Sequence, residues 1–113
     1  MNFKSNTMTL HKNGEVEFLT YDKLSKIDFI NHAFSTRKGG VSTGIYSSMN
    51  LSFEHDDFDK VTENYKRFCK AAGFDFDSLV ASSQDHHTFV RVCKKEHRGI
   101  GIYREKDIQS VDA

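Results

Sequence analysis

Proline is absent from this sequence, and cysteine occurs only twice among its 113 residues. Without proline, the loops lack one common source of stiffness. Cys69 and Cys93 offer at most one disulfide, and the N-terminal residues contain no apolar stretch typical of a signal peptide. We therefore expect two reduced thiols and a cytoplasmic location.

An excess of charge is also missing, because 16 Lys and Arg residues balance 16 Asp and Glu residues. This balance predicts neither a nucleic-acid partner nor binding to an anionic membrane. No apolar run reaches the roughly 18 residues of a membrane span. Hydrophobic residues make up 37% of the chain, and ten of them are Phe, which bury a large area each. We expect one domain over residues 1–113 with one modest core.

The N-terminal region has the pattern of a β-hairpin. Val16, Phe18 and Thr20 alternate with other residues, and Asn13-Gly14 suits a tight turn between two strands. We expect residues 1–26 to form this hairpin and a polar connection. β-Branched and aromatic residues predict further strands over Ile27–Thr36, Ile45–Phe53, Leu79–Ser83 and Thr88–Cys93.

One segment between the expected strands has a helical period instead. An apolar stripe predicts an amphipathic helix within Asp56–Ala72. Asp56 or Asp57 would cap its N-terminus, and Gly73 would end it. The stripe consists of Val61, Tyr65, Phe68, Cys69 and Ala72. Strands, one long helix and more strands together predict an α+β fold of mixed strands.

Two adjacent histidines, His86 and His87, are candidates for chemistry. Imidazole is a common zinc and copper ligand and the usual acid or base near neutral pH. In an extended backbone the two rings would point to opposite faces, so a surface histidine beside a capping one is the alternative. Cys93, His97 and His86 lack the spacing of a strong zinc motif, and Cys69 fits the apolar face of the helix.

A glycine-rich loop, RKGGVSTG at residues 37–44, is the second candidate. Its backbone N–H groups could surround an anion, with Arg37 as a bidentate partner. Because Lys38 precedes the glycines, the loop is not a nucleotide-binding P-loop. A plain glycine turn between strands is the alternative.

These stretches together resemble one family. The resemblance covers about Phe29 to Ala113 and includes Glu63-Asn64 and Gln84-Asp85-His86. It is carried above all by the stretch His32-Ala33-Phe34-Ser35-Thr36-Arg37-Lys38-Gly39-Gly40-Val41-Ser42, followed by Gly44, Tyr46, Ser48 and Met49-Asn50-Leu51. The family is the multicopper polyphenol oxidase or laccase-domain family, also described as zinc-dependent purine nucleoside phosphorylases that deaminate adenosine.

The resemblance implies a layered α/β/β/α fold about twice as long as this chain, so the chain looks like the N-terminal half. It implies a metal site of two histidines and one cysteine, with His86 as the first ligand and the others beyond these residues. Arg37 and Asn50 lie in the opening motif, which implies contact with substrate or phosphate. Asp85 and His87 depart from the usual family residues, and the final stretch, Ile108–Ala113, reads like the approach to another strand.

Three functional hypotheses follow. The first is a zinc-dependent purine nucleoside phosphorylase with adenosine deaminase side activity, acting on a purine nucleoside and phosphate. The second is a copper-dependent polyphenol oxidoreductase, although the sequence contains no His-x-His pair. The third is a fragment that is inactive alone and self-associates through the apolar face left open.

Overall fold

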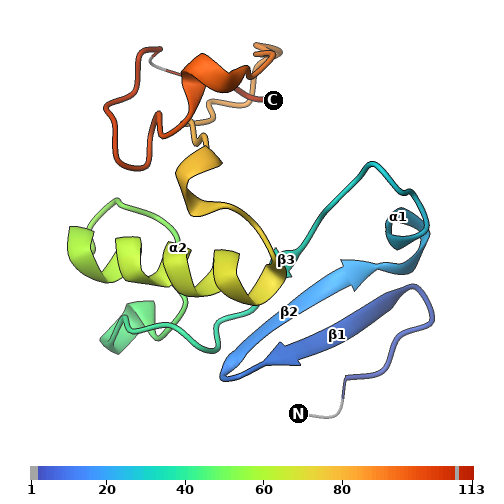
Figure 1. Cartoon of the computed structure of the whole chain (residues 1–113). Coiled ribbons are helices and arrows are strands. Elements are labelled where there is room, and N and C mark those ends of the chain that lie inside the picture. Colours follow the sequence, from blue (N-terminus) through green and yellow to red (C-terminus); the bar gives the residue numbers. More distant parts are fainter. Residues whose placement is uncertain (1–2, 109) are drawn as a thin grey trace. The chain divides into compact units, whose positions relative to one another are not determined.

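The structure is a computed structural model that describes residues 3–108 and 110–113 (Figure 1). These residues form two compact units, one ending at Phe74 and the other comprising Asp75–Ala113. The described part has the predicted α+β composition, with one three-stranded antiparallel sheet and one long helix. Residues 1 and 2 of the predicted hairpin segment, and Gln109 of the strand-like stretch near Ala113, lie outside the described residues.

The predicted hairpin is confirmed, with its turn one residue further along. Strands β1 (Met8–Asn13) and β2 (Val16–Tyr21) pair antiparallel, and Asn13 already faces Val16. The turn is therefore Gly14-Glu15, with Gly14 at a φ of 61°. A glycine at positive φ in the first turn position fits a type II′ turn, whose twist matches that of the strands. The polar connection becomes the short helix α1 (Asp22–Ser25).

The expected strand over Ile27–Thr36 is wrong for most of its length. Only β3 (Phe34–Ser35) pairs with β2. The backbone N–H of Tyr21, at the end of β2, donates to the Nε2 atom of His32 at 2.7 Å. Because a side chain serves as the acceptor there, the ladder does not continue from β3 toward His32.

Helix α2 (Phe58–Ala72) confirms the predicted amphipathic helix. The Asp57 carboxylate caps it by accepting hydrogen bonds from the N–H groups of Asp59 and Lys60, at 2.8 and 3.1 Å. Gly73 ends it in the left-handed conformation, as predicted. The predicted stripe faces inward, with Val61, Phe68 and Cys69 buried.

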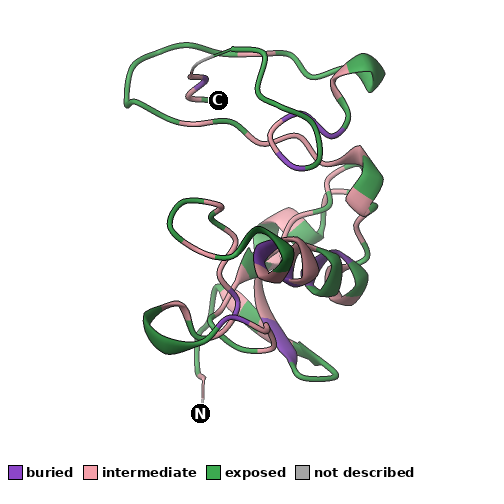
Figure 2. Cartoon of the chain, turned by 90° about the vertical axis from the view of Figure 1, so that its left-hand side faces the viewer, coloured by how far each residue is buried: buried purple, intermediate pink, exposed green. Residues whose placement is uncertain are grey.

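The core of the first unit lies between β2 and α2 (Figure 2, purple). Val16, Met49 and Phe68 form its buried centre, and Phe18 packs edge-on against Phe68. Met49 comes from the loop before the helix, so the loop is part of the packing. This core holds the loop's main chain against the hairpin and the helix.

Asn64 is a polar residue inside the apolar face of α2, and it is fully buried. Its Oδ1 atom accepts from the N–H of Val41 at 2.7 Å. Its Nδ2 atom donates to Ser42 Oγ at 2.9 Å and to the carbonyl of Asn50 at 2.8 Å. One amide therefore ties both arms of the 37–50 loop to the helix.

The expected strand over Ile45–Phe53 is wrong. A short 3₁₀ helix spans Gly44–Tyr46, and the N–H groups of Ser48 and Met49 both donate to the carbonyl of Arg37. These hydrogen bonds close a loop instead of pairing with a strand.

The second unit is built from loops and two 3₁₀ turns, Phe76–Ser78 and Lys95–His97. The expected strands Leu79–Ser83 and Thr88–Cys93 do not form, although isolated bonds are present. Ala81 N donates to Ile100 O, and Val111 N donates to Ser83 O, each at 2.8 Å. The pairing is too interrupted for a ladder, since side chains accept several of the N–H groups. Ile100, Ile102 and Val111 are the buried hydrophobic side chains of the second unit.

Large apolar side chains remain exposed in both units, among them Phe29, Ile45 and Val92. The self-association expected from the sequence stays a prediction. Across the described residues, none of the helices has the length and apolar character needed to cross a membrane.

Replacing Asn64 by Ala should destabilise the first unit. The change leaves the N–H of Val41 and the carbonyl of Asn50 without their buried partner, which predicts a loss of about 2–4 kcal/mol in the free energy of unfolding. Chemical denaturation followed by circular dichroism measures it. Lys70→Ala, on the exposed side of α2, is the matched control, and an equal effect of both changes would contradict the account.

Candidate functional site

The first candidate region is the loop that carries Arg37 and Asn50. The Arg37 main chain is anchored, because its carbonyl accepts from the N–H groups of Ser48 and Met49 at 2.9 Å each and from Ser48 Oγ at 2.7 Å. The Arg37 side chain is exposed. The loop therefore presents a guanidinium to solvent from a fixed backbone.

Four backbone N–H groups of this loop, those of residues 38 and 40–42, are already used inside the protein. Those of Lys38 and Gly40 donate to the hydroxyls of Thr36 and Ser48, both at 3.2 Å. The next two, at positions 41 and 42, donate to the Asn64 side chain and to the Ser48 carbonyl. An anion at this loop would therefore be bound by side chains more than by N–H groups.

Two of the three glycines in this loop, Gly39 and Gly40, serve close packing. A Cβ atom on Gly39 would lie 2.5 Å from the Cα atom of Val16 in β2. One on Gly40 would lie 2.1 Å from the carbonyl oxygen of Ser48. Only glycine fits between the hairpin and the returning loop. This packing accounts for both glycines without a bound anion, although in the part of the chain that the structure describes no strand follows the loop as the plain-turn alternative assumed.

Asn50 belongs to a closed ring of hydrogen bonds. Asp56 Oδ2 accepts from Asn50 Nδ2 at 3.0 Å and from Ser42 Oγ at 2.7 Å. Ser42 and the Asn50 carbonyl both accept from Asn64, which completes the ring. The hydrogen bond from Asn50, followed by that from Ser42, lowers the pKa of Asp56 below its ordinary value. Asp56 therefore fixes the loop instead of capping α2, which is the role of Asp57.

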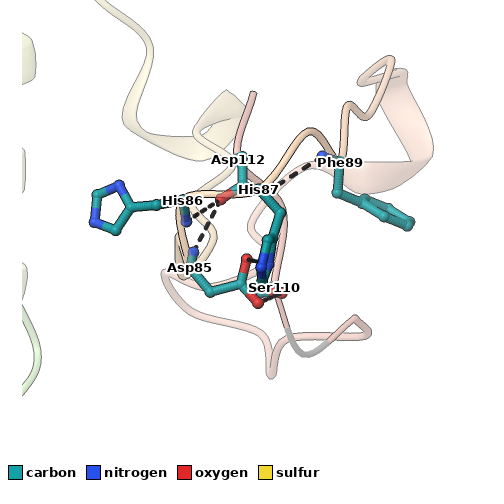
Figure 3. Close-up of polar contacts among 6 residues, drawn as sticks. All are labelled: Asp85, His86, His87, Phe89, Ser110 and Asp112. Atoms are coloured by element: carbon teal, nitrogen blue, oxygen red, sulfur yellow. Dashed lines mark hydrogen bonds and ion pairs between the residues drawn. The ribbon is translucent and has the colours of Figure 1, made fainter.

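The second candidate region is the turn at residues 85–89, which wraps around the carboxylate of Asp112 (Figure 3). Asp112 Oδ1 accepts from the N–H groups of Asp85 and His86, at 2.9 and 2.8 Å. Asp112 Oδ2 accepts from the N–H of Phe89 at 3.3 Å. The N–H of Asp85, with those of Phe89 and His86, lowers the pKa of Asp112.

The two histidines diverge, as expected, but not because the backbone is a strand. His86 adopts a φ of 63°, a left-handed conformation that is uncommon outside glycine. Its ring points away from His87 (Figure 3). His87 Nδ1 lies 3.1 Å from Asp85 Oδ1, and Ser110 Oγ donates to Asp85 Oδ2 at 3.0 Å. Asp85 thus engages His87, while the exposed imidazole of His86 is directed elsewhere.

His86 is the metal-ligand candidate of this region. His86 is exposed, and its backbone is held on the Asp112 carboxylate, so its imidazole fits a ligand role. Nowhere in the described residues do three His, Cys, Asp or Glu side chains gather into a metal site. His97 Nδ1 accepts from the N–H of Lys94 at 2.8 Å, so that nitrogen already has a partner. The described residues could therefore contribute His86 to a metal site, but they do not form a complete site by themselves.

The remaining sequence candidates have structural surroundings. His11 stacks on Phe18 and bonds to Thr20, and His32 accepts from Tyr21. Cys69 is buried on α2 and Cys93 is exposed, and each carries its own thiol.

Two important residues were missed as functional groups. Asn64 was noted only within the family motif, yet a polar residue between Val61 and Phe68 on an apolar stripe signals a buried hydrogen-bonding group. Asp112 carried no comparable signal, because its partners lie 23–27 residues earlier in the chain.

Asp56→Asn should change the pH dependence of stability. Because the folded-state pKa of Asp56 is lowered, its contribution is fully present above the unfolded value of about 3.9 and is lost as the pH falls through the folded value. The variant should be less stable than the wild type at pH 7, and the gap should close below about pH 4. Denaturant unfolding between pH 7 and pH 3 measures this. Asp28→Asn, on an exposed turn, is the control, and a gap that stays constant with pH would contradict the account.

Comparison with known proteins supplies the family. The model of the family described as multi-copper polyphenol oxidoreductase laccase matches residues 31–113, which include the glycine loop, α2 and the His86 turn. That match covers well over half of the chain.

A curated relative is also similar. It is named purine nucleoside phosphorylase, comes from Deinococcus radiodurans, and is 44% identical over 57 residues. The aligned part makes up 50% of this chain and 22% of the relative, so the chain matches only a minor part of that protein's length. The extent of the family match shows that the chain belongs to the multi-copper polyphenol oxidoreductase laccase family.

Proposed function

We propose that this chain is part of a zinc-dependent purine nucleoside phosphorylase. The reaction would convert inosine or adenosine and phosphate into the free base and ribose 1-phosphate, with adenosine deamination as a side activity. The name of the Deinococcus radiodurans relative supports this reaction. The structural observation that carries the proposal is the exposed imidazole of His86 on a turn whose backbone is fixed.

His86 is the metal ligand in this proposal, and a cysteine and a second histidine outside these 113 residues complete the site. When bound, zinc lowers the pKa of a water ligand to about 7, which supplies the nucleophile for hydrolytic deamination. The part of His86 is to donate a ring nitrogen from a fixed direction. We assign this role to His86 and not to His87 because His86 is the histidine of the Gln84-Asp85-His86 motif; the Asp85 contact at His87 Nδ1 would itself allow its Nε2 atom to bind a metal.

Arg37 is the phosphate contact in this proposal. Phosphorolysis needs a phosphate held against the anomeric carbon of the sugar, and an exposed guanidinium can bind it with two parallel hydrogen bonds. Asn50, proposed as a substrate contact at the same loop, also bonds through its amide to Asp56 and to the Ser52 carbonyl. We place the reaction in the cytoplasm, in accord with the low cysteine content of the sequence.

A copper-dependent oxidation of phenols is the second candidate, because the family description names that activity. Multicopper centres need several closely spaced histidines, and the sequence offers no His-x-His pair. Phosphorolysis therefore ranks first. The 113-residue chain alone should be inactive in either case, since one histidine binds a metal weakly.

Base release from inosine and adenosine tests the proposal. The zinc-loaded product of the complete gene should release base only when phosphate is present. His86→Ala should reduce this rate at least about 100-fold and lower the zinc content, because a ligand is lost. His87→Ala, at the neighbouring position, should keep both. Several coppers per chain with phenol oxidation would favour the second candidate, and phosphate-independent release would contradict the first.

Arg37→Ala should raise the KM for phosphate roughly tenfold, equivalent to about 1.4 kcal/mol of lost binding. The KM for the nucleoside should change much less. Arg37→Lys should recover only part of the loss, because lysine lacks the planar fork. Arg98→Ala removes another exposed arginine and serves as the control. Equal effects of both alanine changes would remove Arg37 from the phosphate site.

A further inference from the structure

The Asp112 carboxylate accepts hydrogen bonds from the backbone of a turn that lies far away in sequence. It accepts from the N–H groups of Asp85, His86 and Phe89, which lie 23 to 27 residues earlier in the chain. The two carboxylate oxygens divide these donors, since Oδ1 takes the first two and Oδ2 takes the third. The side chain therefore bridges the beginning and the end of the turn (Figure 3).

The turn needs such a bridge because of the conformation of His86. A φ of 63° costs a non-glycine residue of order 1 kcal/mol, and it persists only where surrounding contacts determine it. The contact on the His86 backbone is the 2.8 Å hydrogen bond to Asp112. If this bond were lost, His86 would return to an ordinary conformation, and its ring would leave its present direction.

The two histidines of the turn are oriented by different contacts. Asp85 has one oxygen near His87 Nδ1 and the other on Ser110 Oγ. The His87 ring is therefore held by the Asp85 carboxylate, in addition to a contact of the His87 N–H with Asp112, whereas His86 is oriented through its backbone.

We infer that Asp112 is a positioning residue for His86, because its carboxylate grips the backbone of the 85–89 turn and thereby fixes the direction of the His86 imidazole. The inference rests on the proposed role of His86 as a metal ligand. Groups that orient a metal ligand typically affect metal affinity by 10–100-fold, even without touching the metal. Asp112 acts on the backbone of His86, whereas such groups more often bind the second ring nitrogen of the histidine.

Amide hydrogen exchange in the 113-residue chain tests whether the Asp112 carboxylate holds the backbone of the turn. Asp112→Ala should speed exchange at least tenfold at the amides of Asp85, His86 and Phe89. Asp112→Asn keeps one oxygen to accept from Asp85 and His86, but it places an NH₂ group opposite the N–H of Phe89. Of the three amides, only that of Phe89 should therefore exchange faster. The Ala81 amide, bonded to Ile100, should be unchanged in both variants and shows that the unit remains folded. Asp107→Ala removes a carboxylate that pairs with Arg91, and it is the matched control.

Zinc affinity of the complete gene product tests the functional consequence, by competition with a chelator. Asp112→Ala should weaken zinc binding at least tenfold, Asp112→Asn should weaken it less, and Asp107→Ala should leave it unchanged. If the three amides stay protected from exchange in Asp112→Ala, the inference is overturned. It is also overturned if they lose this protection while the zinc affinity stays unchanged. Zinc affinity that is insensitive to His86→Ala would instead overturn the proposed metal role.

Discussion

Backbone N–H groups in irregular segments need acceptors, and in this chain side chains supply the decisive ones. Ordered loops make up much of the described chain, so their shape cannot come from helix or strand ladders. In the first unit the acceptor is the Asn64 amide, buried on α2 and bonded to both arms of the 37–50 loop. In the second unit it is the Asp112 carboxylate, which accepts from three N–H groups of the 85–89 turn.

This arrangement has the same consequence in both units. The backbone N–H groups of the loop or turn point toward the accepting side chain, and a functional side chain of the same segment stays exposed to solvent. Arg37 is exposed while its carbonyl accepts three hydrogen bonds. His86 is exposed while its N–H is bonded to Asp112. Fixed backbones with exposed functional groups are what a binding site requires, because the groups then lose little freedom on binding.

The sequence predicted the elements whose signals are local. The α2 stripe, its Asp57 cap and its Gly73 end are all encoded within one segment, and so is the hairpin. The expected strands failed because strand propensity does not specify a partner. Tyr21 donates to the His32 ring, and Phe89 donates to the Asp112 carboxylate, so side chains replace the backbone acceptors that a ladder needs.

For the candidate site, too, the sequence indicates some residues and not others. The family motif singled out His86, Arg37 and Asn50, whereas the residues that hold them could be found only in three dimensions. Asn64 left a signal as a polar residue on an apolar stripe, but Asp112 acts across more than twenty residues of chain. A hydrogen bond of that sequence separation has no periodicity from which to infer it.

The central claim is that His86 is a metal ligand and that His87 is not. X-ray absorption at the zinc edge, on the product of the complete gene, tests it most directly. The account predicts a first shell with two histidine nitrogens and one sulfur, in which His86→Ala removes one nitrogen and His87→Ala removes none. A spectrum unchanged by His86→Ala, or altered only by His87→Ala, would contradict it.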